Sequence, residues 1–129
     1  MKIAALIARI LLGLIFLIFG LNKFLNFLPQ PPLPPLGGQF AGALYVSHEL
    51  LIVAAIEVVT AVLLLANRFV PLALTLLGPV IVNVFLFHAF MAPTGLPTAL
   101  FIVILWSAVF YSVRDAFSSI FVQKIPQRA

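Results

Sequence analysis

The residue best placed to do chemistry in this chain of 129 residues is Glu57, a carboxylate inside a long apolar run. Charged residues make up only 8% of the sequence, so each one that interrupts an apolar segment needs a physical reason. An isolated charged carboxylate in the middle of a lipid bilayer costs about 2.5–3.5 kcal/mol on insertion scales. Glu57 therefore either has a cationic partner or is protonated, and it is the first candidate for a buried polar site.

Two cations and two glycines near the N-terminus share one helical stripe. Arg9, Gly13, Phe16, Gly20 and Lys23 are spaced by 4, 3, 4 and 3 residues, which places all five on one face of a helix. The two glycines predict that a neighbouring helix approaches closely. Two interpretations stay open: a packing face whose cations extend toward opposite membrane surfaces, or a polar site inside a helix bundle.

Arg9 is the partner that we expect for Glu57. Counted at about 1.5 Å per residue, Arg9 lies roughly 8 Å closer to the cytoplasmic face than Glu57 does, and two long side chains nearly span that gap. The hypothesis is a direct or water-bridged Arg9–Glu57 pair. The alternative is a protonated Glu57 that is hydrogen bonded to a serine, a threonine or a backbone carbonyl.

A second polar group falls in the outer turns of the expected helices: Asn22, Lys23, Asn26, His48, Glu49 and His88. Lys23 with Glu49 is the ion pair that we expect there. The two histidines are able in principle to bind a metal or to transfer protons. They lack the i, i+4 pairing and the extra carboxylates of a di-metal bundle, so we favour interfacial hydrogen bonding and no metal site.

The dipeptide Gly78-Pro79 predicts a kink, and Asn83 lies one turn later on the same helical face. A kink beside a buried amide can line a cavity, although more often it packs against a neighbouring helix. Asn83 joins Arg9, Lys23, Glu49 and Glu57 as a buried polar candidate. The sequence contains no nucleophile with its base, no glycine-rich phosphate loop and no haem ligand pair, so we expect no catalytic residues.

The composition places these residues in a membrane protein. The chain is 64% hydrophobic and 8% charged, whereas a soluble domain carries about 25% charged residues. So few charges cannot cover a surface in water, which excludes a soluble enzyme and a disordered linker. The seven cations do not cluster into a nucleic-acid groove, and the absence of cysteine excludes disulfides and thiolate chemistry.

Four apolar segments are long enough to cross a bilayer, which takes about 20 residues. We expect helices over residues 3–28, 47–66, 69–91 and 97–120. The predicted fold is therefore an all-α, four-helix transmembrane bundle that forms one membrane domain over residues 1–129.

Residues 29–46 form an external loop with five closely spaced prolines. The prolines predict a stiff, extended segment, after which Gly37-Gly38 frees the chain for a short surface helix over residues 39–46. We favour a rigid cap over the bundle for this loop, and the alternative is a proline-rich ligand for another protein.

The cations orient the bundle. With both termini in the cytoplasm, six of the seven cations lie on the inner side and only Lys23 lies on the outer side. The inner set is Lys2, Arg9, Arg68, Arg114, Lys124 and Arg128. The positive-inside rule therefore predicts cytoplasmic termini in a multi-pass protein of the bacterial inner membrane.

The first helix resembles the opening signature of the DoxX family, in Arg9 to Gly13 and in Phe19-Gly20-Leu21-Asn22-Lys23. Glu57 and the Arg68 turn also match that pattern, and the resemblance covers roughly residues 5–120. It implies a four-helix transmembrane bundle with Arg9, Lys23 and Glu57 among its characteristic polar residues. Some members are membrane subunits of thiosulfate:quinone oxidoreductase, others are partners in thiol-redox or detoxification assemblies, and related eukaryotic proteins are cargo receptors.

Three functions are compatible with these observations. We favour a non-catalytic accessory subunit of a larger membrane electron-transfer complex, respiratory or photosynthetic, with no cofactor of its own and with lipid or quinone at its surface. Its partners are then the bilayer and other membrane subunits, or a second copy. The alternative is a quinone- or small-molecule-binding oxidoreductase component that uses a buried Arg9/Glu57 site. The third is a small transporter that acts as a homo-oligomer.

The orientation has a direct test, because the chain contains no native cysteine. We expect a single cysteine introduced by Gly38→Cys to react with a membrane-impermeant maleimide from the outer side only, since residues 29–46 are external. Reaction from the cytoplasmic side alone would reverse the predicted orientation.

Overall fold

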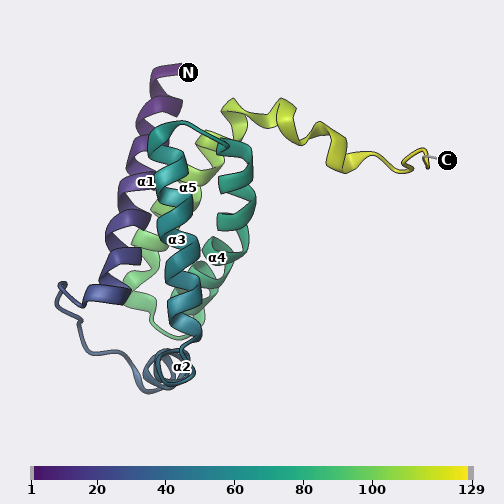
Figure 1. The fold of residues 1–129 in the computed structure, drawn as a ribbon. Coiled ribbons are helices and arrows are strands. Elements are labelled where there is room, and N and C mark those ends of the chain that lie inside the picture. Colours follow the sequence, from purple (N-terminus) through teal and green to yellow (C-terminus); the bar gives the residue numbers. More distant parts are fainter. Residues whose placement is uncertain (1, 128–129) are drawn as a thin grey trace.

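A bundle of four long helices dominates the computed structural model, which describes residues 2–127 (Figure 1). Within that range all regular structure is helical, so the predicted all-α fold is confirmed. The bundle packs in the cyclic order α1, α3, α4, α5, with α1 also against α5. The elements are α1 (Lys2–Leu25), α2 (Pro35–Val46), α3 (Glu49–Ala66), α4 (Val70–Phe90), η1 (Pro93–Gly95), α5 (Leu96–Ser112) and η2 (Arg114–Phe121).

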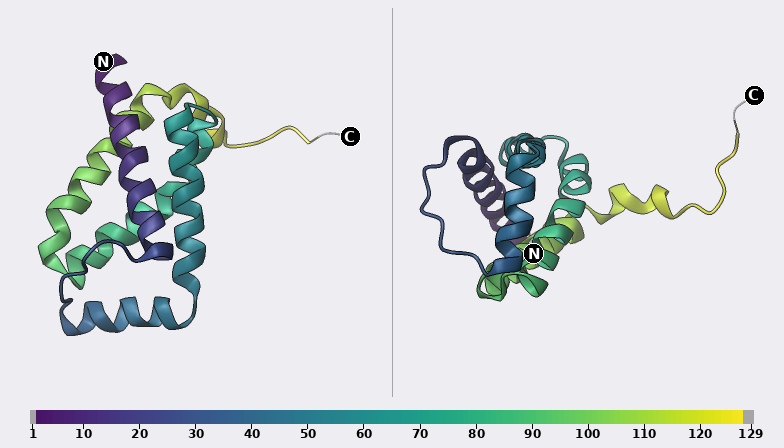
Figure 2. Two further views of the ribbon diagram at one scale, coloured as in Figure 1. Left: turned by 60° about the vertical axis from the view of Figure 1, so that its left-hand side comes forward. Right: turned by 90° about the horizontal axis from the view of Figure 1, so that it is seen from below.

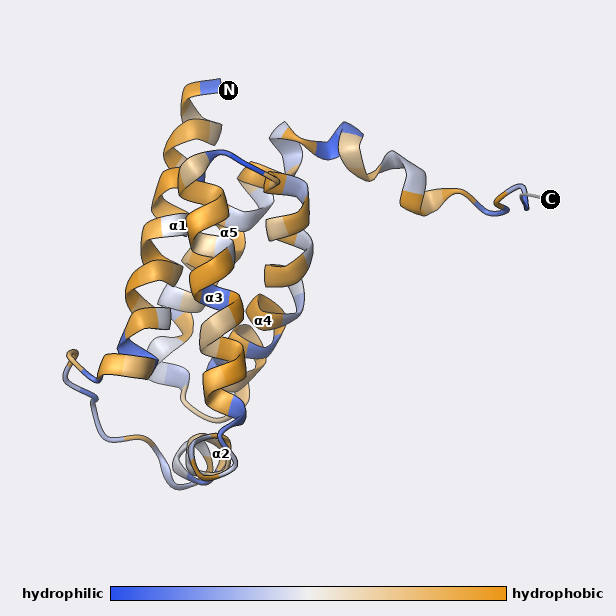
Figure 3. Ribbon diagram, viewed as in Figure 1, coloured by the Kyte–Doolittle hydropathy of each residue, from blue (hydrophilic) through white to orange (hydrophobic). Residues whose placement is uncertain are grey.

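Four helical segments have the length and the composition to cross a membrane: Lys2–Leu25, Glu49–Ala66, Val70–Phe90 and Pro93–Ser112. Hydrophobic residues dominate their surfaces, and hydrophilic residues gather mainly at turns and ends (Figure 3). Between 22% and 28% of the residues in each segment are buried inside the chain, so most of the apolar surface faces outward. Such a surface requires lipid around it, and the chain is a multi-pass integral membrane protein.

The end of α1 and the start of α3 differ from the predicted boundaries by two or three residues. α1 ends at Leu25 rather than at residue 28, because Asn26 takes a left-handed conformation and the Leu28 N–H donates to the Asn22 side chain at 2.8 Å. α3 begins at Glu49 rather than at residue 47, directly after the left-handed His48. Asparagine, and less often histidine, tolerates this conformation, which ends or begins a helix sharply.

The fourth spanning helix is shorter than predicted. α5 ends at Ser112 instead of continuing to residue 120, and a separate 3₁₀ segment, η2, follows it. The Ser112 hydroxyl donates to the Val109 carbonyl at 2.6 Å, a local bond of the kind that competes with helix continuation. Residues 122–127 then run away from the bundle (Figure 1).

The segment between α1 and α3 contains a longer helix than expected. α2 begins at Pro35, which occupies the first helical turn after the extended Pro34. The prediction that Gly37-Gly38 frees the chain is wrong, because both residues lie inside α2. Gly37 instead permits a close contact, since a Cβ there would lie 2.9 Å from the Met91 carbonyl oxygen.

α2 lies across the end of the bundle opposite the N-terminus, roughly perpendicular to the spanning helices (Figure 2). Besides the contact at Gly37, the Phe40 ring packs against the Phe87 ring of α4 with centroids 5.6 Å apart. The cap over the bundle is therefore the helix α2, and the proline-rich stretch before it forms the linker from α1.

α1 and α3 form the most extensive helix pair of the bundle, and two glycines set their separation. A Cβ at Gly13 would lie 2.8 Å from the Leu65 side chain, and one at Gly20 would lie 2.9 Å from the Val58 side chain. The close approach that the glycine spacing predicted is thus confirmed. The same face of α1 buries Leu12 and Phe16 in the core that α3, α4 and α5 complete.

Replacement of Gly20 by leucine should destabilise the bundle by about 1–3 kcal/mol, the usual cost of overpacking. Gly38→Leu is the matched control, because nothing lies within 4 Å of a Cβ at Gly38. Unfolding by SDS in mixed micelles, followed through Trp106 fluorescence, measures both variants. Equal stability of the two variants would contradict the close approach of α1 and α3.

Candidate functional site

A buried ion pair joins α1 to α3. Lys23 Nζ lies 2.9 Å from Glu57 Oε2, and the Glu57 side chain is only 2% exposed. The Lys23 side chain is 24% exposed, and its Nζ also approaches the Phe19 carbonyl oxygen at 3.5 Å. Glu57 therefore has the cationic partner that its position inside a membrane requires.

The partner is Lys23 and not Arg9, so the predicted Arg9–Glu57 pair is wrong. The helices are antiparallel, and the glycine contacts set their register: Gly13 meets Leu65 and Gly20 meets Val58. Glu57 is thus level with about position 21 of α1, some twelve residues or roughly 18 Å from Arg9. Lys23 lies only two residues further along α1, and helical side chains point toward the N-terminus of their helix, which brings its ammonium back to Glu57.

Arg9 has a different acceptor at the opposite end of the same interface. Its guanidinium donates to the Leu64 carbonyl in the last turn of α3. That carbonyl also accepts the Asn67 N–H at 3.2 Å, while the Arg68 N–H donates to Leu63 at 3.0 Å in the turn after the helix. A cation at a helix C-terminus is stabilised by the unpaired carbonyls and the helix dipole. Arg9 therefore caps α3 and takes no part in the site around Glu57.

The predicted Lys23–Glu49 pair is also absent from the described structure, since Lys23 binds Glu57. Glu49 is exposed in the first turn of α3, where its N–H donates to the Ser47 hydroxyl at 3.3 Å. Eight residues, or roughly 12 Å of helix, separate it from Glu57. An acidic residue at this position complements the positive end of the helix dipole.

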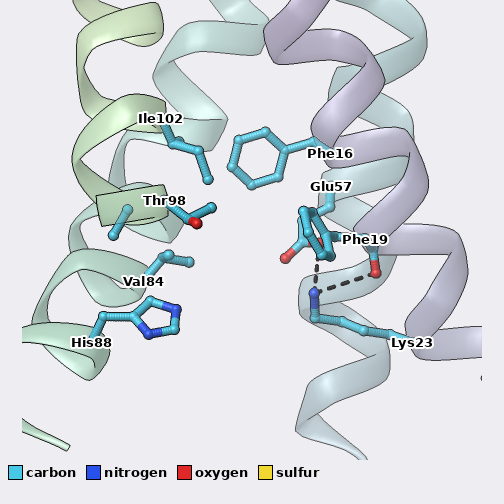
Figure 4. Close-up of a pocket in the computed structure, with 9 residues that line it drawn as sticks. Phe16, Phe19, Lys23, Glu57, Val84, His88, Thr98 and Ile102 are labelled. Atoms are coloured by element: carbon cyan, nitrogen blue, oxygen red, sulfur yellow. Dashed lines mark hydrogen bonds and ion pairs between the residues drawn. The ribbon is translucent and has the colours of Figure 1, made fainter. Parts of the chain in front are cut away.

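The Lys23–Glu57 pair borders a cavity of about 160 Å³ in the half of the bundle that is nearer to α2 (Figure 4). All four spanning helices contribute to its wall. The lining residues are Phe16, Phe19, Lys23, Glu57, Val84, His88, Thr98, Ala99 and Ile102. Phe19 and Thr98 are the exposed members of this set, and they belong to the neighbouring helices α1 and α5. The mouth of the cavity therefore lies between α1 and α5 and faces lipid.

His88 lies on the wall opposite the ion pair, and its ring points across the cavity toward Lys23 (Figure 4). Its Nδ1 lies 3.2 Å from the Ala92 carbonyl oxygen. A carbonyl only accepts, so Nδ1 carries the hydrogen of that bond, and in the neutral ring Nε2 is left as an acceptor on the cavity side. Gly95 makes room for the ring, because a Cβ there would lie 2.3 Å from it.

Other predicted polar residues do not join this group. Asn22 is buried, but its side chain accepts the Leu28 N–H and so holds the turn after α1. Asn26 and His48 are exposed residues in left-handed turns. Asn83 was expected to be buried and is instead exposed, and its amide donates to the Pro79 carbonyl of its own helix at 2.8 Å.

Pro79 lies inside α4, and the turn before it has a partner that the sequence did not indicate. The Trp106 indole N–H donates to the Leu74 carbonyl at 3.0 Å, and the ring edge lies 4.0 Å from where a Cβ of Gly78 would be. Trp106 thus stabilises the turn of α4 that precedes Pro79. Thr98 was missed as a lining residue as well, although its spacing from Ala99 and Ile102 puts the three on one face of α5.

The cavity offers hydrogen bonds of both kinds within apolar walls. Lys23 donates, Glu57 accepts, and His88 accepts through Nε2 in its neutral form. Phe16 and Ile102 supply apolar contact on the inner side. Such a site suits one small group that carries both hydrogen-bond acceptors and donors, with any apolar extension directed through the mouth into lipid.

The DoxX family model matches residues 4–89, which is 86 of the 129 residues or two thirds of the chain. The matched segment contains Lys23, Glu57 and His88, whereas α5 lies outside it. No curated protein and no solved structure matches the chain.

Loss of Lys23 should lower the unfolding free energy by about 3 kcal/mol, because Lys23→Met leaves a buried carboxylate without its cation. Adding Glu57→Gln should recover much of this loss, since the pair is then removed together. The control is the double-mutant cycle of Arg9→Met with Glu57→Gln, in which the two losses of unfolding free energy should simply add. SDS unfolding measures all variants, and equal coupling energies in the two cycles would contradict the assigned partners.

Proposed function

The chain belongs to the DoxX family, and we propose that it is an accessory subunit of a larger membrane electron-transfer complex. Its contribution is a binding site for the head group of a membrane quinone or a similarly small molecule. The redox centres of the complex belong to other subunits in this proposal. The protein lies in the bacterial inner membrane with both termini in the cytoplasm.

The observation that carries the proposal is the Lys23–Glu57 ion pair on the wall of a lipid-facing cavity. An ion pair inside a bundle is costly to desolvate, and in membrane segments such charges commonly mark a ligand or proton site. A volume of about 160 Å³ equals roughly five water volumes. That space suits a single substituted ring and leaves no room for a larger cofactor.

The donor and acceptor pattern fits both redox forms of a quinone. A quinone carbonyl accepts a hydrogen bond, and the Lys23 ammonium on the cavity wall is a donor for it. A quinol hydroxyl donates one, and Glu57 and His88 are the acceptors. The aromatic and aliphatic walls contact the ring faces, and the isoprenoid tail remains in lipid beyond the mouth between α1 and α5.

The outward apolar faces support the accessory role. Between 22% and 28% of each spanning segment is buried within the chain, so the helices have surface available for other membrane subunits or for a second copy. Packing between membrane helices needs close shape complementarity more than further polar groups. A subunit that only packs, with no ligand in the cavity, is the second candidate.

Binding of a short-chain benzoquinone to the full chain in nanodiscs tests the proposal. Lys23→Met should raise Kd at least about tenfold, which corresponds to about 1.4 kcal/mol. Lys124→Met removes the same charge from the tail outside the cavity and should leave Kd unchanged. Calorimetry measures both variants against the wild-type chain.

A second pair of variants separates the two candidate roles. Glu57→Gln should change the affinity ratio of quinol to quinone, while Glu49→Gln, an identical change at an exposed position, should not. Equal binding by all variants, or no saturable binding by the folded wild-type chain, would leave the packing role as the function.

A further inference from the structure

The C-terminal part of the described chain begins where α5 leaves the membrane. Arg114 fixes this point: its guanidinium donates to the Tyr111 carbonyl at 2.7 Å and lies 4.1 Å from the centre of the Tyr111 ring. Tyrosine and arginine are typical of the boundary between hydrocarbon and head groups. η2 therefore starts at the level of the membrane surface.

Phe117 fixes the direction in which η2 faces. It is buried, and its ring packs on Phe110 of α5 with centroids 4.8 Å apart. Because Phe110 belongs to a spanning helix, the side of η2 that carries Phe117 faces the membrane. A 3₁₀ helix has three residues per turn, so Ile120 lies on the same side one turn later.

Beyond Phe117 the apolar side chains have little protein around them. Ile120 is 69% exposed, Phe121 is 76% exposed and Ile125 is 74% exposed. The segment runs sideways from the end of the bundle (Figure 1), and polar residues alternate with these side chains, among them Ser118 and Lys124. This composition is typical of segments that lie in a membrane interface.

We infer that residues 114–125 lie along the bilayer surface and insert Ile120, Phe121 and Ile125 between the lipid head groups and acyl chains. The bilayer is the apolar phase within reach, since η2 follows α5 after a single residue, Val113, and shares the side on which Phe117 meets α5. Lys124 then remains at the level of the lipid phosphates with its charge in water. The segment is an anchor that holds the bundle at a fixed depth, independent of the cavity and its ligand.

Fluorophores at single cysteines in the full chain test this inference, because the chain has no native cysteine. Ile120→Cys and Ser119→Cys, each labelled with NBD, are compared in nanodiscs of phosphatidylcholine and phosphatidylglycerol. Position 120 should emit at shorter wavelength, and lipids with a nitroxide near the head group should quench it at least about twofold. Position 119, which is exposed and shares a side of the 3₁₀ helix with neither Ile120 nor Phe121, should emit as in water and show less quenching.

Two results would overturn the inference. Water-like, unquenched emission at both positions would mean that the segment is free in solution. A shifted emission at position 120 that nitroxide lipids do not quench would mean that protein, from a second copy, covers the segment. Unchanged Trp106 fluorescence verifies in each case that the bundle is folded.

Discussion

The contact between α1 and α3 is the constraint on which the rest of the bundle depends. Inside a bilayer no water is available to solvate a charge or a backbone group, so each polar atom needs a partner in the protein. The two glycines of α1 bring the backbones close enough for both cations of the stripe to reach α3. Arg9 then satisfies a carbonyl at the end of α3, and Lys23 neutralises the carboxylate in its middle.

The cavity follows from that arrangement. Lys23 and Glu57 bind each other at the edge of the four-helix interior and do not fill it, and small or flat groups surround the remaining space. On the opposite wall, Gly95 and the Ala92 carbonyl hold the His88 ring in one orientation. Charged and polar atoms are thus fixed before any ligand arrives, which lowers the entropic cost of binding.

Sequence reasoning predicted the four spans, the close approach at the glycines and the importance of Glu57, because hydropathy and helical periodicity act locally. It assigned the wrong partners to Glu57 and Lys23, because pairing depends on the register between helices, which shifts by about 1.5 Å for each residue. It placed Asn83 inside the bundle for a related reason, since periodicity alone does not say which face of an apolar helix meets lipid. The extent of α2 and α5 depends on details that hydropathy does not report, such as the tertiary contact of Gly37 with the Met91 carbonyl and the local bond from the Ser112 hydroxyl to Val109.

The position of the cavity mouth determines whether the occupancy of the cavity depends on the ligand's concentration in the bilayer or on its concentration in water. Since the exposed lining residues, Phe19 and Thr98, lie on spanning helices, the ligand proposed above would enter from the hydrocarbon and not directly from water. The concentration that matters is then the mole fraction of the ligand in the bilayer. Water-soluble compounds of the same shape would compete poorly for the cavity, even if they formed the same hydrogen bonds. Added lipid dilutes the molecule and empties the cavity, even when the total amount in the sample stays constant.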